Sequence, residues 1–306
     1  MARIAVIGSL NMDLVVRVPR IPEPGETILG ADDLQMIPGG KGANQACASA
    51  RLGAEVAMVG RVGDDTFGEQ LINSLKKGGV DTQHITRDSE ASTGIALIVV
   101  EEGGQNSIVV SSGANGRVTP SDVSRAEAVI WSADLILLQL EIPLTSVIKA
   151  AQCAKHHGVK VILNPAPAQQ LPAELLSLTD ILIPNETEAA MLSGCDVDTD
   201  DGIRKAASRL RQSGVKTIIM TRGSRGASLI TENEIEHLTA FPVEPVDTTA
   251  AGDAFVGSFA VALAEGRPLA EAVKFGNAAG ALASTKPGAQ PSMPGRDDLE
   301  KMLQTM

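Results

Sequence analysis

The chain has 306 residues, 43% of them hydrophobic, so it can bury a substantial core as one large domain or as one domain with an appendage. Its 37 acidic side chains outnumber its 26 basic ones, which gives a formal net charge of −11. A surface this acidic argues against nucleic acid and anionic membranes as partners, because both are bound through basic patches. It does not exclude ATP, since a local nest of backbone N–H groups can hold an anion on an acidic protein.

Neither a membrane span nor a secretion signal is predicted. No apolar run approaches the ~20 residues that a membrane-spanning helix needs. Residues 4–7 form an apolar segment near the start of the chain, without the layout of a signal peptide. A cytoplasmic location is therefore expected.

The cysteines and histidines show no metal-binding pattern. Cys47, Cys153 and Cys195 are isolated from one another in the sequence, and we interpret them as buried, reduced thiols. The histidines follow no zinc-binding spacing. Any metal ion is therefore expected to have oxygen ligands.

Residues 3–7 form a short apolar run that ends in Gly8, which is typical of a central parallel strand. Asn11 and Asp13 follow its carboxyl end, where ligands bind in an open α/β sheet. Two residues apart in an extended segment, they face the same side and can hydrogen-bond the hydroxyls of a polyol. A turn favoured by Asn and Asp explains this segment equally well by itself.

Two segments have the pattern of strands outside the main sheet. Residues 14–38 combine alternating valines with prolines, and residues 93–100 and 107–111 form a hairpin pattern around a glycine-containing turn at residues 101–104. We expect residues 14–38 and 93–111 to form a small β lid that excludes water from the reaction. Residues 1–13, 39–92 and 112–306 are then expected to form the larger α/β domain.

A glycine-rich helix start lies at residues 39–46. Gly39, Gly40 and Gly42 allow a ligand to approach the backbone, and Asn44 lies just inside the helix, where it can reach a sugar hydroxyl. The segment is not a Walker A loop, so Lys41 is not interpreted as a P-loop lysine.

The remainder of the chain alternates helices with short apolar runs. A strand at residues 55–59 and a helix at residues 67–77 come first, followed by apolar runs at residues 134–139, 159–163, 180–183 and 216–220. This spacing predicts successive βαβ units with right-handed crossovers. The runs end in polar residues, which we expect to build one cleft at one edge of a parallel sheet.

Residues 246–255 form the predicted catalytic centre. Two prolines in residues 241–246 exclude a helix there, and apolar spacing from Ala254 predicts that a helix begins near Thr249 and Ala250. The first turn of a helix attracts anions, and Gly252 allows a phosphoryl group to approach its N–H groups. Asp253 can then accept a proton from an attacking hydroxyl. The alternative, equally good from local sequence, is that Asp247 or Thr249 caps the helix and Asp253 only favours its dipole.

Three motifs carry a resemblance to a known family. Residues 39–44 (GGKGAN), 185–188 (NETE) and 247–253 (DTTAAGD), in this order, resemble the ribokinase family of carbohydrate kinases over essentially the whole chain. The resemblance implies a three-layer α/β/α Rossmann-like fold with a small β-sheet lid that also clasps a homodimer. It also implies transfer of the γ-phosphoryl group of ATP to O5 of D-ribose.

The resemblance assigns roles to individual positions. Asp253 is implied as the base, with Ala250, Ala251 and Gly252 as the anion hole. Asn185 and Glu188 are implied to organise Mg²⁺ through water. The sugar site is implied at Asn11, Asp13, Gly40, Lys41, Asn44, Glu141 and Asp253; the nucleotide site at Asn185, Thr221, Gly223, Ser224, Arg225, Gly226, Gly252 and Asn277; and an activating K⁺ site at Asp247, Thr249, Ala283, Lys286, Gly288 and Ser292.

Structural alternatives remain open for several of these residues. Glu141 could cap the helix that starts at Pro143. Asn185 and Glu188 fit a capping box. Arg225 has the pattern of an ordinary surface arginine, and Lys286 that of a solvated charge unless its carbonyl is the ligand.

Other functions are also compatible with the family. Members of the family phosphorylate 2-deoxyribose, fructose phosphates or nucleosides, and a non-catalytic sugar-binding module is a further alternative. Asp13 is the candidate for distinguishing ribose from 2-deoxyribose through the 2-hydroxyl. A nucleoside substrate is disfavoured because the expected lid contains no Tyr or Trp on which a base could stack.

Overall fold

A computed structural model describes residues 1–103 and 105–305. A nine-stranded sheet forms its centre, in the order β13-β12-β11-β10-β9-β8-β1-β4-β5. In this order, the seven strands β11, β10, β9, β8, β1, β4 and β5 run parallel to one another. Strand β12 pairs antiparallel with β11, and β13 pairs antiparallel with β12. The strands are β1 (Arg3–Ile7), β4 (Glu55–Gly63), β5 (Val80–Asp88), β8 (Leu135–Leu138), β9 (Lys160–Leu163), β10 (Ile181–Leu182), β11 (Thr217–Thr221), β12 (Ala227–Ile230) and β13 (Ile235–Leu238).

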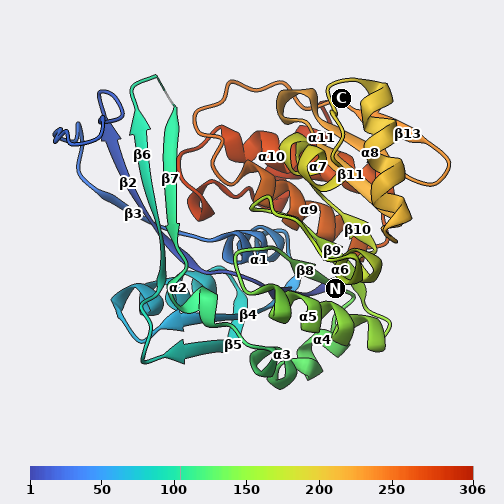
Figure 1. Ribbon diagram of the computed structural model, residues 1–306, viewed down its shortest axis with the longest axis horizontal. Coiled ribbons are helices and arrows are strands. Elements are labelled where there is room, and N and C mark those ends of the chain that lie inside the picture. Colours follow the sequence, from blue (N-terminus) through green and yellow to red (C-terminus); the bar gives the residue numbers. More distant parts are fainter. Residues whose placement is uncertain (104, 306) are drawn as a thin grey trace.

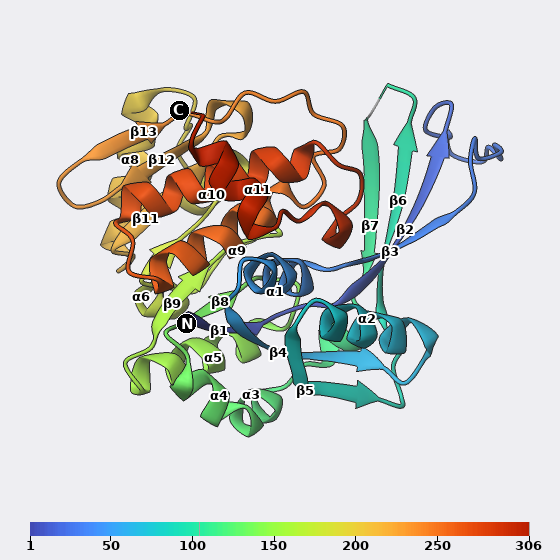
Figure 2. The same cartoon turned by 180° about the vertical axis from the view of Figure 1, so that it is seen from behind.

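Helices cover both faces of this sheet, which confirms the predicted three-layer α/β/α fold (Figure 1). Side chains of one strand alternate between the faces, so Ile4 and Val6 join one apolar core while Ala5 and Ile7 join the other. One face carries α1 (Lys41–Arg51), α2 (Thr66–Lys77), α9 (Ala251–Ala264), α10 (Leu269–Ser284) and α11 (Arg296–Leu303), which are in front in Figure 2. The other carries α3 (Pro120–Arg125), α4 (Glu127–Ser132), α5 (Leu144–His156), α6 (Ala173–Leu178), α7 (Glu186–Ser193) and α8 (Asp200–Gln212).

Helix α9, which carries predicted site residues, is deeply packed. It is apolar on all sides, as expected of a helix enclosed by other elements, and residues 253–262 are all buried. Gly257 lets α1 approach closely, because a Cβ at this position would lie 2.7 Å from the Cβ of Ala48. Nearer their starts, the two helices are joined by hydrogen bonds from Asn44 and Gln45 to Asp253.

A second sheet stands beside the main body, as both views show (Figure 1). It has four strands, in the order β3 (Gln35–Gly39), β2 (Asn11–Val18), β6 (Gly94–Glu101) and β7 (Asn106–Ser111). The predicted hairpin of β6 and β7 is confirmed by their antiparallel pairing, although the predicted turn includes Gly104, which lies outside the described residues. Strand β2 begins at Asn11, so Asn11 and Asp13 belong to this sheet. The division of the chain into a catalytic domain and a lid stays a prediction.

The remaining elements whose positions were predicted lie close to them. Helix α2 begins one residue before the predicted position, and β8, β9, β10 and β11 occupy the four predicted apolar runs. The pairing of β12 with β13 was not anticipated. Short 3₁₀ helices occur at η1 (Gly113–Arg117), η2 (Gly223–Arg225) and η3 (Gln290–Ser292). Within the described part of the chain, no helix combines the length and the apolar character needed to span a membrane.

Candidate active site

The carboxyl ends of the parallel strands carry the predicted polar residues. The chain places β4 and β5 on one side of β1, and β8 to β11 on the other. In open α/β sheets, ligands bind at the carboxyl ends of the strands where the strand order reverses in this way. Glu141 follows β8, Asn164 follows β9 and Asn185 follows β10, so these side chains share one edge of the sheet.

Helix α9 begins at Ala251, one residue after the predicted start near Thr249 and Ala250, and no side chain caps it. Ala250 occupies the cap position with φ of 60°, a left-handed conformation that costs an alanine about 1 kcal/mol. Asp247 instead accepts hydrogen bonds from the backbone N–H of Thr249 at 2.9 Å and of Gly288 at 2.8 Å. The alternative that Asp247 or Thr249 caps this helix is therefore wrong.

Asp253 is buried in the first turn of α9, and each of its carboxylate oxygens has a partner. Oδ2 accepts a hydrogen bond from Asn44 at 2.9 Å, and Oδ1 accepts one from Gln45 at 3.0 Å. Gln139 donates in turn to Oε1 of Gln45 at 2.6 Å. This buried chain of amides fixes the orientation of the carboxylate.

The sequence analysis did not single out Gln45. Its position inside the glycine-rich segment, directly after Asn44, was the available signal. Gln45 is fully buried and also donates to Oδ1 of Asn164 at 3.1 Å, so it joins the ends of α1, β9 and α9. We describe it as a positioning residue, because it acts through Asp253.

Glu141 gathers donors from two distant parts of the chain. Its Oε2 accepts hydrogen bonds from the Ser9 hydroxyl at 2.5 Å, from Nδ2 of Asn11 at 3.4 Å and from the backbone N–H of Lys41 at 3.2 Å. Helix α5 has Pro143 at its cap position and no side-chain cap. The alternative that Glu141 caps this helix is therefore wrong.

Asp13 is 7% exposed and lies close to other carboxylates. Burial, followed by the negative charges of Glu141 and Asp253, raises the pKa of Asp13 to about 7. Gly39 on the adjacent strand makes room for the group, because a Cβ there would lie 2.1 Å from Oδ2 of Asp13. Asn11 and Asp13 are both buried on the same side of β2, as predicted.

Lys41 supplies the positive charge of this cluster. Burial alone would lower the pKa of its ammonium group, but the surrounding carboxylates outweigh burial and raise the pKa. Gly40 precedes it at the cap of α1 with φ of 89°, a conformation that favours glycine. The carboxylates around Lys41 are Asp253, Glu141, Glu188 and Asp13.

A cavity of about 720 Å³ lies at the start of α9, on the side opposite the carboxylate cluster. Ala251 and Gly252 line it, so adjacent residues of one helix turn face the cavity and the carboxylate cluster. Arg225 does not line the cavity, but it forms an ion pair with Glu186, which does. The predicted nucleotide residues that line the cavity are Asn185, Thr221, Gly223, Ser224, Gly226, Gly252 and Asn277.

An apolar wall of this cavity escaped the sequence analysis. Two prolines in residues 241–246 exclude a helix there, and no motif in the sequence marks the segment as a wall. The amide nitrogen of Asn277 donates to the carbonyls of Leu238 and Thr239 at 3.1 Å each, which holds this segment against α10. The wall consists of Ala240, Phe241, Pro242, Val243 and Pro245.

Asn185 and Glu188 form a capping box at the start of α7, so the structural alternative for them is confirmed. Oε2 of Glu188 accepts the N–H of Asn185 at 2.9 Å, and Oδ1 of Asn185 accepts the N–H of Glu188 at 2.8 Å. Burial raises the pKa of Glu188. The cap does not exclude a second role, because Asn185 also lines the cavity.

The positions implied for a monovalent cation lie in two joined loops and at the end of α10. Burial would raise the pKa of Asp247, but hydrogen bonds from Thr249 and Gly288 outweigh it and lower the pKa. Asp247 is therefore a charged carboxylate that joins the two loops through the backbone N–H groups of Thr249 and Gly288. Gly288 is joined to the Asp247 loop by its hydrogen bond to the carboxylate. Ala283 lies in the last turn of α10, and its carbonyl accepts the N–H of Lys286 at 3.2 Å. Ser292 lies in η3.

Comparisons with known proteins agree with this geometry. A family model described as pfkB family carbohydrate kinase matches residues 1–296. The chain is 46% identical to a ribokinase of Haemophilus influenzae, with 98% of each chain covered. It is 40% identical to a deoxyribokinase of Salmonella typhi, again with 98% of each covered. The solved structure of Arabidopsis thaliana ribokinase complexed with ribose and ATP superposes with a TM-score of 0.92, at 37% identity and 99% coverage of both chains. The chain belongs to the pfkB family of carbohydrate kinases.

Proposed function

We propose that this protein transfers the γ-phosphoryl group of ATP to O5 of D-ribose. One observation carries the proposal: consecutive residues at the start of α9 face two different sites, with Gly252 on the large cavity and Asp253 in the carboxylate cluster. A kinase needs its nucleotide and its acceptor on opposite sides of the group that is transferred. The similarity to a ribokinase and to a ribokinase complexed with ribose and ATP supports ribose as the acceptor.

The polar cluster around Asp253 is the proposed sugar site. Oδ1 of Asn44 is buried and has no hydrogen-bond partner among the described residues, so a sugar hydroxyl would satisfy it. Asn11, Asp13 and Glu141 supply further polar groups for the remaining hydroxyls. The backbone at Gly40 and the ammonium group of Lys41 complete the site.

Asp253 is the proposed general base. It takes the proton from the 5-hydroxyl as that oxygen attacks phosphorus, and the hydrogen bonds from Asn44 and Gln45 hold its carboxylate in position. Backbone N–H groups of Ala250, Ala251 and Gly252 are proposed to stabilise the developing negative charge. A Cβ at Gly252 would meet nothing within 4 Å, so the phosphoryl group can approach this turn.

The cavity beside α9 is the proposed ATP site. Its apolar wall suits the adenine ring, while Thr221, Gly223, Ser224 and Gly226 supply polar groups at its edge. Arg225 is proposed to act at its mouth and Asn277 on its inner wall.

Two kinds of cation are proposed to assist the reaction. Asn185 and Glu188 would hold Mg²⁺ through water, and this ion would neutralise phosphate charge. A K⁺ ion would fix the loop that carries the anion hole. The residues proposed for K⁺ are Asp247, Thr249, Ala283, Lys286, Gly288 and Ser292.

A second candidate acceptor is 2-deoxy-D-ribose. The 40% identity to a deoxyribokinase over 98% of the chain favours it specifically. Asp13 is the proposed discriminator, because a buried group that hydrogen-bonds a 2-hydroxyl would lose its partner with the deoxy sugar.

The second sheet is proposed as a lid and as the contact of a homodimer. Met36, Leu97 and Val109 are exposed apolar residues, and the strand register places them in one row with Leu14 across all four strands. Residues directly opposite one another on neighbouring strands share a face, so this row is a continuous apolar stripe. A second copy would cover it.

We place the protein in the cytoplasm.

ATP-dependent ADP release with Mg²⁺ and K⁺ tests the proposed function. The acceptors to compare are D-ribose, 2-deoxy-D-ribose, fructose and adenosine. We expect rapid turnover with ribose. Preference for another acceptor would replace the substrate but keep the kinase chemistry, whereas no turnover with any of them would favour a non-catalytic sugar-binding module.

A further inference from the structure

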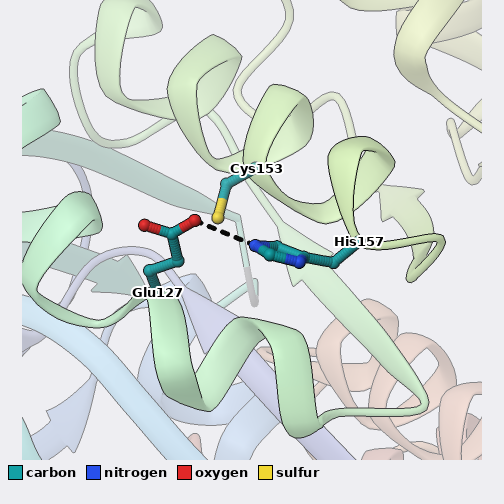
Figure 3. A group of neighbouring side chains, drawn as sticks. All are labelled: Glu127, Cys153 and His157. Carbon is teal, nitrogen blue, oxygen red and sulfur yellow. Dashed lines mark hydrogen bonds and ion pairs between the residues drawn. The ribbon is translucent and has the colours of Figure 1, made fainter.

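Outside the active site, three metal-ligating side chains of different chemistry lie together where α4 packs against α5. They are Glu127, Cys153 and His157, and their potential ligand atoms all lie within 4.8 Å of one another. Figure 3 shows the cysteine sulfur beside the carboxylate and the imidazole ring. The sequence analysis found no metal-binding pattern here, because Glu127 comes from a different helix.

The two helices bring these groups together for simple geometric reasons. Cys153 lies in the last turn of α5, and His157 is the residue that follows the helix, four positions later. The two side chains therefore lie on one face, one turn apart. Glu127 is the first residue of α4. Cys153 is 7% exposed, whereas the Glu127 side chain is 54% exposed, so the sulfur lies at the inner end of the cluster and the carboxylate at the solvent edge.

An ion pair explains part of this arrangement. Nε2 of His157 and Oε1 of Glu127 are 2.9 Å apart, within hydrogen-bond distance. This pair would join α4 to α5 without any metal. It does not require a thiol beside the two partners, which is the feature that distinguishes a metal site from an ion pair.

We propose that Glu127, Cys153 and His157 form a binding site for Zn²⁺. A thiolate, an imidazole and a carboxylate are the side chains that zinc prefers, whereas Mg²⁺ and Ca²⁺ prefer oxygen ligands alone. A tetrahedral zinc ion holds its ligand atoms roughly 3.5 Å apart. The three atoms, within 4.8 Å of one another, would have to close to that separation on binding, and a water molecule would take the fourth position.

The chain contains a reporter for this site. Trp131 is its one tryptophan, the chain has no tyrosine, and the ring centroids of Trp131 and His157 are 6.2 Å apart. Titration of metal-free protein with Zn²⁺, followed by tryptophan fluorescence, therefore reads the cluster directly. We expect saturation at one ion per chain and a higher Tm in the presence of Zn²⁺.

Cobalt identifies the ligands. Substitution of Co²⁺ for Zn²⁺ gives a thiolate-to-cobalt charge-transfer absorption and the visible bands of tetrahedral cobalt when a cysteine is bound. We expect both in the wild type and neither in Cys153→Ser. Glu127→Gln lies at the solvent edge and leaves the core intact, and we expect it to weaken Zn²⁺ binding by at least about 10-fold.

Two variants serve as matched controls. Cys195→Ser removes another thiol that is outside the cluster, and His156→Gln removes the neighbouring histidine; both should bind Zn²⁺ as the wild type does. Absence of a saturable fluorescence change would overturn the proposal. So would a cobalt spectrum without charge-transfer absorption, or loss of binding in His156→Gln with normal binding in Cys153→Ser.

Discussion

Asp253 is a buried carboxylate whose two oxygens both accept hydrogen bonds from amide groups. In Asp253→Asn the shape is kept, but the side chain cannot take a proton from the sugar hydroxyl. We expect kcat to fall by roughly 10²–10⁴-fold, the range of a general base, while ribose binding is retained. Steady-state kinetics and calorimetric ribose binding measure the two quantities. Nearly unchanged turnover would mean that another group is the base.

At Asp13 the charge state should change near neutral pH. Its pKa is raised from 3.8 to about 7, so between these values the folded protein keeps a proton that the unfolded chain has released. Stability therefore falls as the pH rises through this window, and the full penalty is present above pH 7. We expect Asp13→Asn, which carries no charge, to gain Tm relative to the wild type progressively from about pH 4 to pH 8. Thermal unfolding without sugar measures this, and a Tm difference that does not change with pH would contradict it.

Several site residues could be predicted because one motif held all the information needed. Asp253 and Gly252 are adjacent, and the helix start is visible in the sequence, so their placement required no tertiary contact. The role of Glu141 in holding Ser9 and Asn11 depends on the pairing of β1 with β8, which local patterns do not report. For the same reason, local sequence could not decide whether Glu141 was a cap.

Among the elements, strands β2 and β3 meet where the sugar is proposed to bind. In Gly39→Ala the new Cβ would lie 2.1 Å from Oδ2 of Asp13, so the carboxylate must move. Because a displacement of about 1 Å can cost on the order of 10²-fold in rate, we expect kcat/KM for ribose to fall by that order with little loss of stability.

Gly295→Ala is the matched control for this variant. A Cβ at Gly295 would meet nothing within 4 Å, and the residue lies just before α11. It should leave kcat/KM unchanged. Equal kinetics for both variants would show that Gly39 does not shape the sugar site.

The central strands of the main sheet could be predicted from the sequence, but the hairpin of β12 and β13 at its edge could not. Buried parallel strands such as β8 and β9 are uninterrupted apolar runs, so the sequence marks them clearly. The hairpin of β12 and β13 contains charged and exposed positions, including Glu236, and gives a weaker signal. The wall at Phe241 becomes recognisable only when α10 packs beside it.

At the scale of the whole molecule, the apolar stripe on the second sheet determines the proposed association. Replacing Leu97 and Val109 with lysine would place charges at positions that are 46% and 64% exposed. Burying an unpaired charge in an interface is costly, so we expect the double variant to be monomeric at concentrations where the wild type is dimeric. Sedimentation equilibrium measures this, with Met191→Lys on α7 as a control of similar exposure. A dimeric double variant would place the interface elsewhere.

The link between the two sheets is short. Strand β1 ends at Ile7 and β2 begins at Asn11, so only residues 8–10 separate the main sheet from the strand that carries Asn11 and Asp13. Any swing of the second sheet must therefore carry these two side chains with it. With the second sheet as the proposed lid, an open molecule lacks a complete acceptor site, and we expect lid closure and sugar binding to be coupled. When ATP is bound without sugar, no ordered hydroxyl lies beside Asp253 to attack the γ-phosphoryl group. We therefore expect ADP release without sugar to be at least about 10²-fold slower than with ribose. Rapid hydrolysis of ATP without sugar would contradict this proposed coupling.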